Sequence, residues 1–554
     1  MVASAHPAST QAGLDVLKDG GNAFDAAVAV ASTLNVVEPF MSGVGGIGVA
    51  LLYVAREKRT RVLNFSGRAA SGATPDQYDE QTKQIGPKAP LVPGNVAGWL
   101  TWHEKYGKLP RKRLFRDAID LAANGVPLTP FSSEMLALNW SLLTAFDSTR
   151  RSFLSGAEKP APAGALFRQP DLARSLSEIA ENGKSVFYEG RLARSIVDSF
   201  AKQGGLLTQE DLASYRAEWE EPLSTSYRGY EVRVPPPNSS GFQIVETLNI
   251  LEGYENLEYG AEDTLHLLIE AVKLAVEDRL DYGGDPAMSG IPIERLLSKQ
   301  YAASLRKQIS LRTARAQKPQ RYPREHLAAG DGLPSERPQF EARPGAVGTS
   351  AGAARSRWQD GNDWWRHGLT THFAVVDQEG NAVTVTQTLG NGYGCGLVAE
   401  GTGIFLNNMC LWFDIDPTVP SVNLIAPRKR VDFCVSPTQV FLNDGLRLSI
   451  GTPGSYGILQ TTAQIICNVL DSGMNVQEAI EAPRFRMQEP GVMNFEGRFP
   501  QELVDALNAR GHTITRLPQG WSRLVGGAHG IQLTEYDTLL GGADPRRDGL
   551  ALGF

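Results

Sequence analysis

The sequence predicts an α+β fold, with helices concentrated in its first part and strands after residue 370. Residues 263–281 carry apolar side chains at helical spacing, and residues from about 110 to 275 are mostly helical in pattern. After residue 370, short β-rich runs alternate with glycine turns. The chain has 554 residues, 42% apolar and 21% charged, which is typical of a soluble globular protein with a large core.

Charge and hydropathy exclude two kinds of partner. The net charge of -7 and the isoelectric point near 5.8 argue against a nucleic-acid binder. The chain has no run of about eighteen apolar residues, so we expect no transmembrane helix and no membrane partner. Residues 1–7 lack the basic start and apolar core of a signal peptide. We therefore expect a cytoplasmic protein, or a periplasmic or secreted one if an export signal has been removed.

The cysteines give no sign of a metal site or a disulfide framework. All four follow residue 370, and their spacing matches neither pattern: Cys395, Cys410, Cys434 and Cys467. We interpret them as buried thiols and expect neither a metal nor a cofactor.

The first segments predict two helices and two strands. Residues 11–36 are helical in pattern, with a break at residues 20–23. The glycine-rich run 42–48 is not followed by Lys-Ser/Thr, so it is not a P-loop, and no ribose-binding acid supports a dinucleotide site. We expect these glycines to allow close approach of strands and helices before a strand at 49–54. A second strand, 61–65, leads to Arg68, and a lone arginine is usually a surface charge.

The middle of the chain is predicted to be largely helical. Residues 93–99 are expected to form a turn that opens a helix, and residues 207–212 carry a helix-cap signature. Residues 235–241 precede a further helix, and the helix at 263–281 belongs to the core. From about residue 313 to 366 no apolar period is visible and Ala, Arg, Gly, Pro, Gln and Ser dominate, so we expect a mobile segment.

A hairpin follows this segment. Residues 373–376 form a short apolar run, residues 378–381 a turn, and residues 382–386 a β-rich run. The hairpin begins with Thr370 and Thr371, and because threonine is common in strands a structural role is the simpler interpretation of this pair alone. Later, strand 446–450 ends in the turn 451–457 before a helix. That turn could be only a tight connection, but backbone N–H groups at such turns are natural oxyanion donors.

Residues 368–377 resemble the start of the small subunit in the γ-glutamyltranspeptidase family, whose precursors cut themselves before a Thr-Thr-His-aromatic segment. Segments 93–99, 451–457, 482–485 and 543–546 extend the resemblance over nearly the whole chain. It implies an N-terminal nucleophile hydrolase fold, a four-layer αββα sandwich built from two chains of a self-cleaved precursor. The large subunit would be 1–369, with its mobile tail at about 313–366, and the small subunit 370–554. Together they would form one structural unit.

The resemblance assigns roles to individual residues. The self-cleaved bond would be Leu369–Thr370, which makes Thr370 both nucleophile and new N-terminus. A hydroxyl needs an adjacent base, and the freed α-amine, with a pKa near ~8, supplies one within the same residue. We expect Thr371 to orient Thr370 through a hydrogen bond. The amides of Gly454 and Ser455 would form the oxyanion hole. The fork of donors on Arg68 would bind a substrate carboxylate bidentately.

The region that reads a glutamyl amino group departs from the family pattern. Family members place an amide and an acid just after a Leu-Asn-Asn turn, an Asn after the nucleophile hairpin, and a serine pair before Ser-Pro-Thr. Here an apolar residue or a cysteine stands at most of these places, and the Asn is displaced by one position, to Asn391 beside Gly390. The substrate-binding candidates are Thr388, Asn391, Met409, Trp412, Phe433 and Cys434. An ammonium buried without its carboxylate partner would cost on the order of 2–5 kcal/mol.

The sequence therefore predicts a self-processing threonine amidohydrolase/acyltransferase, made as a zymogen, that acts on a small amide with water or an amine as acceptor. Its acyl group would lack the α-amine, as in the cephalosporin acylases of this family. The first alternative is an ordinary γ-glutamyltranspeptidase of glutathione metabolism, with Asp414 or Asn391 covering the lost contacts. The second is an inactive homologue kept as a binding subunit. The two processed chains would form a heterodimer, with a dimer of heterodimers as a further option.

Overall fold

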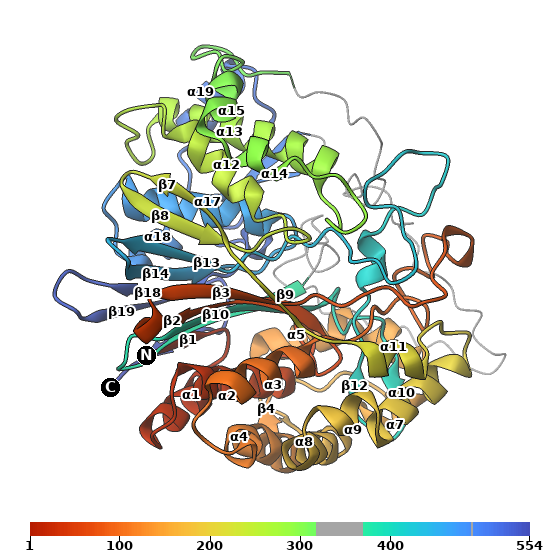
Figure 1. The fold of residues 1–554 in the computed structure, drawn as a ribbon. Coiled ribbons are helices and arrows are strands. Elements are labelled where there is room, and N and C mark those ends of the chain that lie inside the picture. The colour runs from red at the N-terminus through yellow and green to blue at the C-terminus, as the bar shows by residue number, and fades with distance from the viewer. Residues whose placement is uncertain (317–368, 489–490) are drawn as a thin grey trace.

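The structure, a computed structural model, describes residues 1–316, 369–488 and 491–554. Two antiparallel sheets lie face to face at its centre (Figure 1). The seven-stranded sheet has the order β20 (Leu550–Leu552), β1 (Val2–Ser4), β9 (Leu369–Val376), β10 (Ala382–Gly390), β2 (Ile47–Val54), β3 (Arg59–Phe65), β6 (Glu218–Glu220). The six-stranded sheet has the order β19 (Leu539–Ala543), β18 (His529–Leu533), β14 (Gly445–Gly451), β13 (Thr438–Leu442), β8 (Tyr230–Val234), β7 (Leu223–Tyr227).

Helices cover the outer face of each sheet. The seven-stranded sheet is covered by α1 (Pro7–Lys18), α2 (Ala23–Val37) and α3 (Asn95–Tyr106), and α4 (Arg111–Asn124) and α8 (Pro170–Asn182) pack behind them. The six-stranded sheet is covered by α12 (Phe242–Leu251), α17 (Gly457–Leu470) and α18 (Val476–Glu481), with α13 (Glu262–Tyr282) outside α12. The predicted four-layer αββα architecture is confirmed.

The remaining elements are short. They are β4 (Val126–Pro127), α5 (Pro130–Leu138), α6 (Trp140–Thr144), α7 (Asp147–Ser152), β5 (Leu166–Phe167), α9 (Lys184–Tyr188), α10 (Arg191–Ala201), α11 (Gln209–Ser214), α14 (Ile293–Leu297), α15 (Lys299–Arg306), β11 (Val398–Ala399), β12 (Ile404–Phe405), β15 (Phe485–Gln488), β16 (Val492–Phe495), α19 (Gln501–Ala509) and β17 (Ile514–Arg516). Short 3₁₀ turns also occur: η1 (Ala55–Glu57), η2 (Pro75–Gln77), η4 (Met409–Trp412) and η5 (Arg523–Val525).

Both sheets combine strands from the two sides of the Leu369–Thr370 bond. In the seven-stranded sheet, β9, β10 and β20 are interleaved with β1, β2, β3 and β6. In the other, β8 pairs with β13 through Val232 and Val440. Two polypeptides made by a cut at this bond would therefore remain joined by shared sheets and a shared core.

The β9–β10 hairpin has the predicted position, and its side chains point alternately to the helices and to the six-stranded sheet. Thr370 pairs with Thr388, and His372 with Thr386. Phe373 and Val375 belong to the core that includes α2, whereas Ala374 packs with residues of the six-stranded sheet. Because side chains alternate along a strand, Thr370 faces the second sheet and Thr371 faces the helices.

The glycine run 42–48 brings segments close together, as predicted. A side chain at Gly45 would place its Cβ 2.2 Å from the Phe405 carbonyl oxygen, and one at Gly46 would lie 2.6 Å from the Thr388 carbonyl oxygen. Only residues without a Cβ can bring these backbones so near the hairpin.

The expectation of a mostly helical stretch from 110 to 275 needs one correction. Residues 218–234 contain the strands β6, β7 and β8. Buried and less buried residues alternate along β7 and β8, as expected for strands with one face on a core. The turn residues Arg228 and Gly229, both with positive φ, close this hairpin. Most of the segment predicted to be mobile, 313–366, lies outside the described residues.

Two of the family-like segments meet in the core. Arg484 donates to the carboxylate of Asp544 over 2.6 Å, and Arg546 donates to the same carboxylate over 2.9 Å. Both arginine side chains and this aspartate are fully buried. The two arginines hold the pKa of Asp544 well below its usual range, although burial alone would raise it. This network fixes the chain end near β18.

In the described ranges, no helix is long and apolar enough to cross a lipid bilayer. All four cysteines are free thiols there, three of them buried and Cys467 half-buried.

Candidate active site

Thr370 lies at the start of β9 with its side chain fully buried. Within the described part of the chain, its hydroxyl has no hydrogen-bond partner. A buried polar atom without a partner is unusual in a native core and needs an explanation. A nucleophile whose reaction partner is its own preceding carbonyl provides one.

Thr388 contacts the bond predicted to be cut. Its hydroxyl donates to the carbonyl oxygen of Leu369 over 2.5 Å and accepts from the amide of Gly390 over 2.8 Å. A donor on a carbonyl oxygen stabilises the negative charge that develops when a nucleophile attacks the carbon. Thr388 thus lies where it can assist attack on the Leu369 carbonyl.

Thr371 does not orient Thr370 in the way the sequence suggested. Its hydroxyl donates to Glu38, 3.4 Å from Oε2, and not to Thr370. The reason is geometric, because neighbouring residues in a strand point to opposite faces. Burial raises the pKa of the Glu38 carboxyl to about 8, against the opposing effect of the Arg547 guanidinium. Glu38 follows α2 directly and was not predicted as a site residue.

Gly454 and Ser455 lie in the turn between β14 and α17. Both have positive φ, 133° and 55° respectively, which turns successive amides toward one side. No hydrogen bond from either amide is found among the described residues. The turn starts near β9, because a Cβ on Gly451 would lie 2.4 Å from the His372 ring. This geometry suits the predicted oxyanion hole.

Met409 fills space beside the hairpin. A Cβ on Gly390 would lie 2.1 Å from Asn408 Oδ1 and 3.2 Å from Met409 Sδ, so the Asn408 and Met409 side chains occupy the space beside this glycine. Gly390 pairs with Leu369, which puts the thioether close to the predicted cleavage bond. The neighbouring Asn391 is half-buried, and its backbone N–H donates to Asn408 Oδ1 over 2.9 Å.

Trp412 and Phe433 belong to one aromatic cluster. Their ring centroids are 6.1 Å apart, and the Trp412 ring lies 5.4 Å from that of Tyr456. Tyr456 follows Ser455 directly, so the cluster adjoins the Gly454–Ser455 turn. Cys434 is fully buried next to Phe433, and burial raises the pKa of its thiol.

The acids near this cluster already have partners. Asp432 accepts from Arg279 over 3.3 Å, from the Tyr456 hydroxyl over 3.4 Å and from Ser240. Asp414 accepts from the Ser421 hydroxyl within its own loop. Each carboxylate is therefore engaged by the protein, which weakens the alternative in which Asp414 binds a substrate ammonium.

Arg68 also has a protein partner. Its guanidinium donates to Glu218 Oε1 over 2.5 Å and to the Arg428 carbonyl oxygen over 3.1 Å. Its side chain is 30% exposed, so a ligand could still reach it. A substrate carboxylate would have to displace or share Glu218, a residue that the sequence did not single out.

Sequence reasoning missed Glu38, Glu218 and Tyr456 for different reasons. Glu38 was passed over although a carboxylate directly before a proline and the glycine run is an unusual choice in an apolar stretch. Glu218 lay in a stretch predicted to be helical. Tyr456 lies in the turn 451–457, where only the backbone amides of Gly454 and Ser455 were predicted to be functional.

Another cluster could suggest a metal site. Ligand atoms of His266, Glu270 and His512 lie within 4.8 Å of one another, and all three residues are buried. Lys273 Nζ donates to Glu270 Oε1 over 2.8 Å and to His512 Nδ1 over 3.2 Å. The lysine ammonium therefore already supplies the positive charge, and burial with Lys273 lowers the pKa of His512 to about 3. We assign no metal to it.

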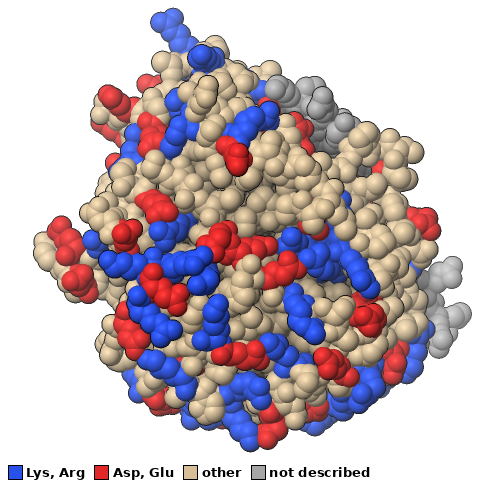
Figure 2. Space-filling view, in the orientation of Figure 1, with Lys and Arg blue, Asp and Glu red and all other residues tan. Residues whose placement is uncertain are grey.

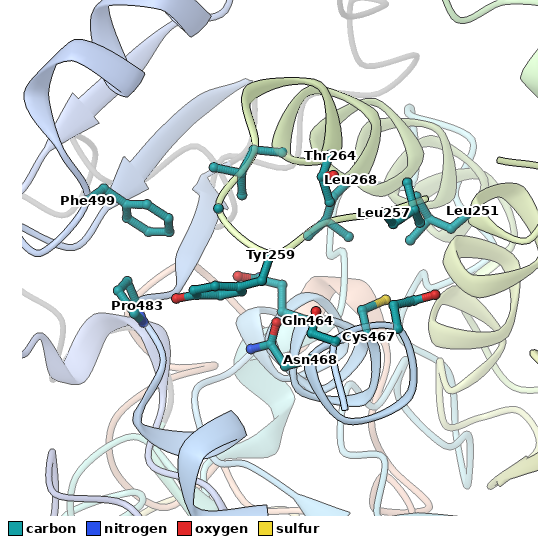
Figure 3. Close-up of a pocket in the computed structure, with 14 residues that line it drawn as sticks. Leu251, Leu257, Tyr259, Thr264, Leu268, Gln464, Cys467, Asn468, Pro483 and Phe499 are labelled. Carbon is teal, nitrogen blue, oxygen red and sulfur yellow. The ribbon is translucent and has the colours of Figure 1, made fainter. Parts of the chain in front are cut away.

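Neither the face shown in Figure 2 nor an apolar hollow beside α12 offers a competing site. On the face in Figure 2, basic and acidic side chains are interspersed without a large patch of one sign. An apolar hollow lies between α12, α13 and α17, with Leu251, Leu268 and Cys467 in its wall (Figure 3). Its volume of about 40 Å³ is far below the ~300–1,000 Å³ of ligand pockets. None of the predicted site residues lines it.

Comparisons with known proteins agree over the whole chain. The family model for gamma-glutamyltranspeptidase matches residues 9–554. The acylase ACY 1 proenzyme of Pseudomonas sp. (strain SE83) is 35% identical over 565 residues, covering 99% of this chain and 92% of that protein. The glutathione hydrolase proenzyme of Escherichia coli (strain K12) is 34% identical over 575 residues, covering 100% of this chain and 92% of that protein.

Solved structures give the same result. The crystal structure of cephalosporin acylase from Bacillus halodurans matches with a TM-score of 0.85 and 32% identity. The match covers 99% of this chain and 94% of that one. A relative called glutathione hydrolase-like YwrD proenzyme, from Bacillus subtilis (strain 168), is 36% identical and covers 100% of this chain and 98% of its own length.

Proposed function

The chain belongs to the γ-glutamyltranspeptidase family of self-processing amidohydrolases, and we propose that Thr370 is its nucleophile and Leu369–Thr370 the bond that it cuts. The observation that carries this proposal is the hydrogen bond from Thr388 to the Leu369 carbonyl oxygen. This bond places a donor on the carbonyl that precedes Thr370, a buried threonine whose hydroxyl has no partner among the described residues.

The proposed cut proceeds in two steps. Thr370 Oγ attacks the Leu369 carbonyl carbon, a C–O bond forms, the C–N bond breaks, and the nitrogen receives the hydroxyl proton. Water then hydrolyses the ester, which leaves a carboxylate on Leu369 and a free amine on Thr370. In later turnovers that amine takes the proton of Thr370 Oγ, and the oxygen attacks the substrate carbonyl to form a C–O bond. The substrate C–N bond then breaks, and its nitrogen receives the proton from the Thr370 amine and leaves as an amine. Water or an amine acceptor resolves the acyl ester.

The two products would be chains of 369 and 185 residues. The strands shared between the sheets support a heterodimer that stays together after the cut. Intact-mass measurement of freshly purified protein tests this step, and an active enzyme that remains one uncut chain would overturn it.

We further propose that the acyl group lacks an α-amine. Met409, Trp412, Phe433 and Cys434 are buried and apolar or soft, and the nearby carboxylates Asp432 and Asp414 are engaged by protein groups. A substrate ammonium would lose its hydration there without gaining a carboxylate partner. Relatives named acylase and cephalosporin acylase support an acylase activity.

The second candidate is an ordinary glutathione hydrolase, favoured by the names of other relatives at similar identity. Comparing glutaryl, simple acyl and γ-glutamyl anilides decides between the two. A binding subunit without activity is disfavoured by the retained Thr370, Thr388 and Gly454–Ser455 turn. Detectable turnover of any anilide, lost in Thr370→Ala, would eliminate it.

A further inference from the structure

Buried polar atoms without partners gather on the helix side of β9, behind Thr370. Glu38 is 1% exposed, and only its Oε2 has a hydrogen bond, from the Thr371 hydroxyl 3.4 Å away. In the described chain, Glu38 Oε1 and Arg547 Nε have no hydrogen-bond partner. The Arg547 guanidinium donates to Met41 Sδ over 3.2 Å, a weak acceptor for a buried cation.

Arg547 contacts parts of the molecule that meet at the proposed nucleophile. A Cβ on Gly527 would lie 2.3 Å from Arg547 Cγ, and the Gly527 amide donates to Thr452 Oγ1 over 3.1 Å at the base of the Gly454–Ser455 turn. Met41 belongs to the same buried apolar cluster as Leu369, the residue that precedes the bond to be cut. Arg547 therefore connects the turn, the end of α2 and the surroundings of β9.

Glu38 and Arg547 both contact Met41, whose backbone amide donates to the Glu38 carbonyl oxygen over 2.9 Å and whose Sδ accepts from the Arg547 guanidinium over 3.2 Å. Burial raises the pKa of Glu38 to about 8 and lowers that of Arg547 to about 10, and in each case the other residue is the strongest opposing charge. The other charged groups facing them are Asp548, which acts on both, and Arg523 and Asp544, which act on Arg547. Two buried groups of opposite charge stabilise one another, and each alone would be strongly unfavourable.

We propose that Glu38, which faces the buried charge of Arg547 across Met41, holds Thr371 and so aligns Thr370 for attack on the Leu369 carbonyl. Glu38 is a positioning residue, because Thr370 and Thr371 point to opposite faces of β9 and Glu38 therefore does not take the proton of Thr370. Holding the Thr371 side chain fixes the strand on one face while the Thr370 hydroxyl stays free on the other. This inference rests on Thr370 being the nucleophile.

The test uses the full-length chain and four variants: Glu38→Gln, Arg547→Met, the double variant and Glu246→Gln. Glu246 is a matched control, because it is a fully buried carboxyl whose pKa is also raised by burial, but it lies on α12 in the opposite helix layer. Self-cleavage is followed in newly translated protein by the time course of chain separation. Processed protein is then assayed for kcat and KM on an acyl anilide, and its Tm is measured.

At about pH 9, above the pKa of Glu38, each single variant should slow self-cleavage and lower kcat by about tenfold with KM little changed. The double variant should be no worse than the poorer single one, because removing both charges leaves neither unpaired. The wild-type rate of self-cleavage, which precedes the release of the Thr370 α-amine, should rise between about pH 7 and 9, and this rise should be absent in Glu38→Gln. Glu246→Gln should behave as wild type.

Several results would overturn the inference. One is a double variant whose loss is the product of the two single losses. Another is a lowered Tm with kcat and pH profile unchanged, which would make the pair purely structural. If Glu38→Gln, Arg547→Met and the double variant all fail to fold, the two residues are likewise purely structural. Each of these leaves wild-type cleavage intact, whereas an uncut wild-type protein would instead contradict the proposed nucleophile.

Discussion

The Thr388 hydroxyl donates to the Leu369 carbonyl oxygen over 2.5 Å, across a hairpin in which Thr388 pairs directly with Thr370. The sheet register thus places a donor on the carbonyl of the residue that precedes the proposed nucleophile. The same hydroxyl accepts from the Gly390 amide, which orients its proton toward Leu369. Thr388 is therefore held by hydrogen bonds to both Leu369 and Gly390, next to the bond to be broken.

Replacing Thr388 by valine removes this donor and keeps the shape of the side chain. We expect Thr388→Val to slow self-cleavage by about a hundredfold, as removal of an oxyanion donor does. Thr388→Ser, which keeps the hydroxyl, should remain within about tenfold of wild type. The measurement is the time course of precursor disappearance by intact mass. Equal rates for the valine variant and wild type would show that the hydrogen bond has no part in the cut.

Thr370 itself should be irreplaceable as a nucleophile. Thr370→Ala should stay one chain of 554 residues and be inactive, because no hydroxyl can attack Leu369. Thr370→Ser should process more slowly, since the hydroxyl is kept but the methyl group that restricts its rotamer is lost. Mass spectrometry and an anilide assay on the same preparations measure both effects. A cut alanine variant would place the nucleophile elsewhere.

The sequence predicted the hairpin, the turns and the layer order because each rests on local pattern or on a resemblance spread along the whole chain. It could not predict pairings such as Thr371 with Glu38, which lie 333 residues apart and depend on which face of β9 meets α2. The engagement of Arg68 by Glu218 was equally hidden, because β6 was predicted to be helical. The role assigned along with the family resemblance had Thr371 donate to Thr370, but strand alternation makes the two side chains face opposite ways.

Glu218 should compete with a substrate carboxylate for Arg68. We expect Glu218→Gln to lower KM for anilides that carry an acyl carboxylate, by about threefold to tenfold, because the guanidinium is released. Arg68→Lys should weaken the same substrates by about 1–3 kcal/mol in kcat/KM, since the fork of donors is lost. Anilides without a carboxylate serve as the control. Equal effects on both substrate classes would make Arg68 a structural residue that holds the end of β3.

Glu38 should make the folded protein less stable as pH rises. Its pKa is near 4.5 in an unfolded chain and about 8 when buried, so between these values the folded state holds a proton that the unfolded state has lost. The resulting contribution to the free energy of unfolding decreases as pH rises from about 4.5 to 8. In an uncut Thr370→Ala background, Glu38→Gln should weaken the fall of Tm across this range. Identical pH profiles for the two proteins would contradict the raised pKa.

The last prediction concerns acyl specificity. If Met409, Trp412, Phe433 and Cys434 surround the acyl group, an α-ammonium has no close anionic partner, because Asp432 is held by Arg279 and Ser240. A glutaryl anilide should then show a higher kcat/KM than the γ-glutamyl anilide, and Trp412→Asp should narrow the gap by supplying a carboxylate. Trp412→Leu is the matched control, since it removes the ring without adding charge.

The ratio of kcat/KM for the two anilides is the deciding quantity, because expression and folding effects cancel within one variant. Trp412→Asp should shift this ratio toward the γ-glutamyl substrate by about tenfold, or about 1.4 kcal/mol, while Trp412→Leu leaves it near the wild-type value. A wild-type preference for the γ-glutamyl anilide of about tenfold or more would refute the specificity proposal. The acid to examine would then be Asp414, whose bond from Ser421 would have to open for its carboxylate to meet the ammonium.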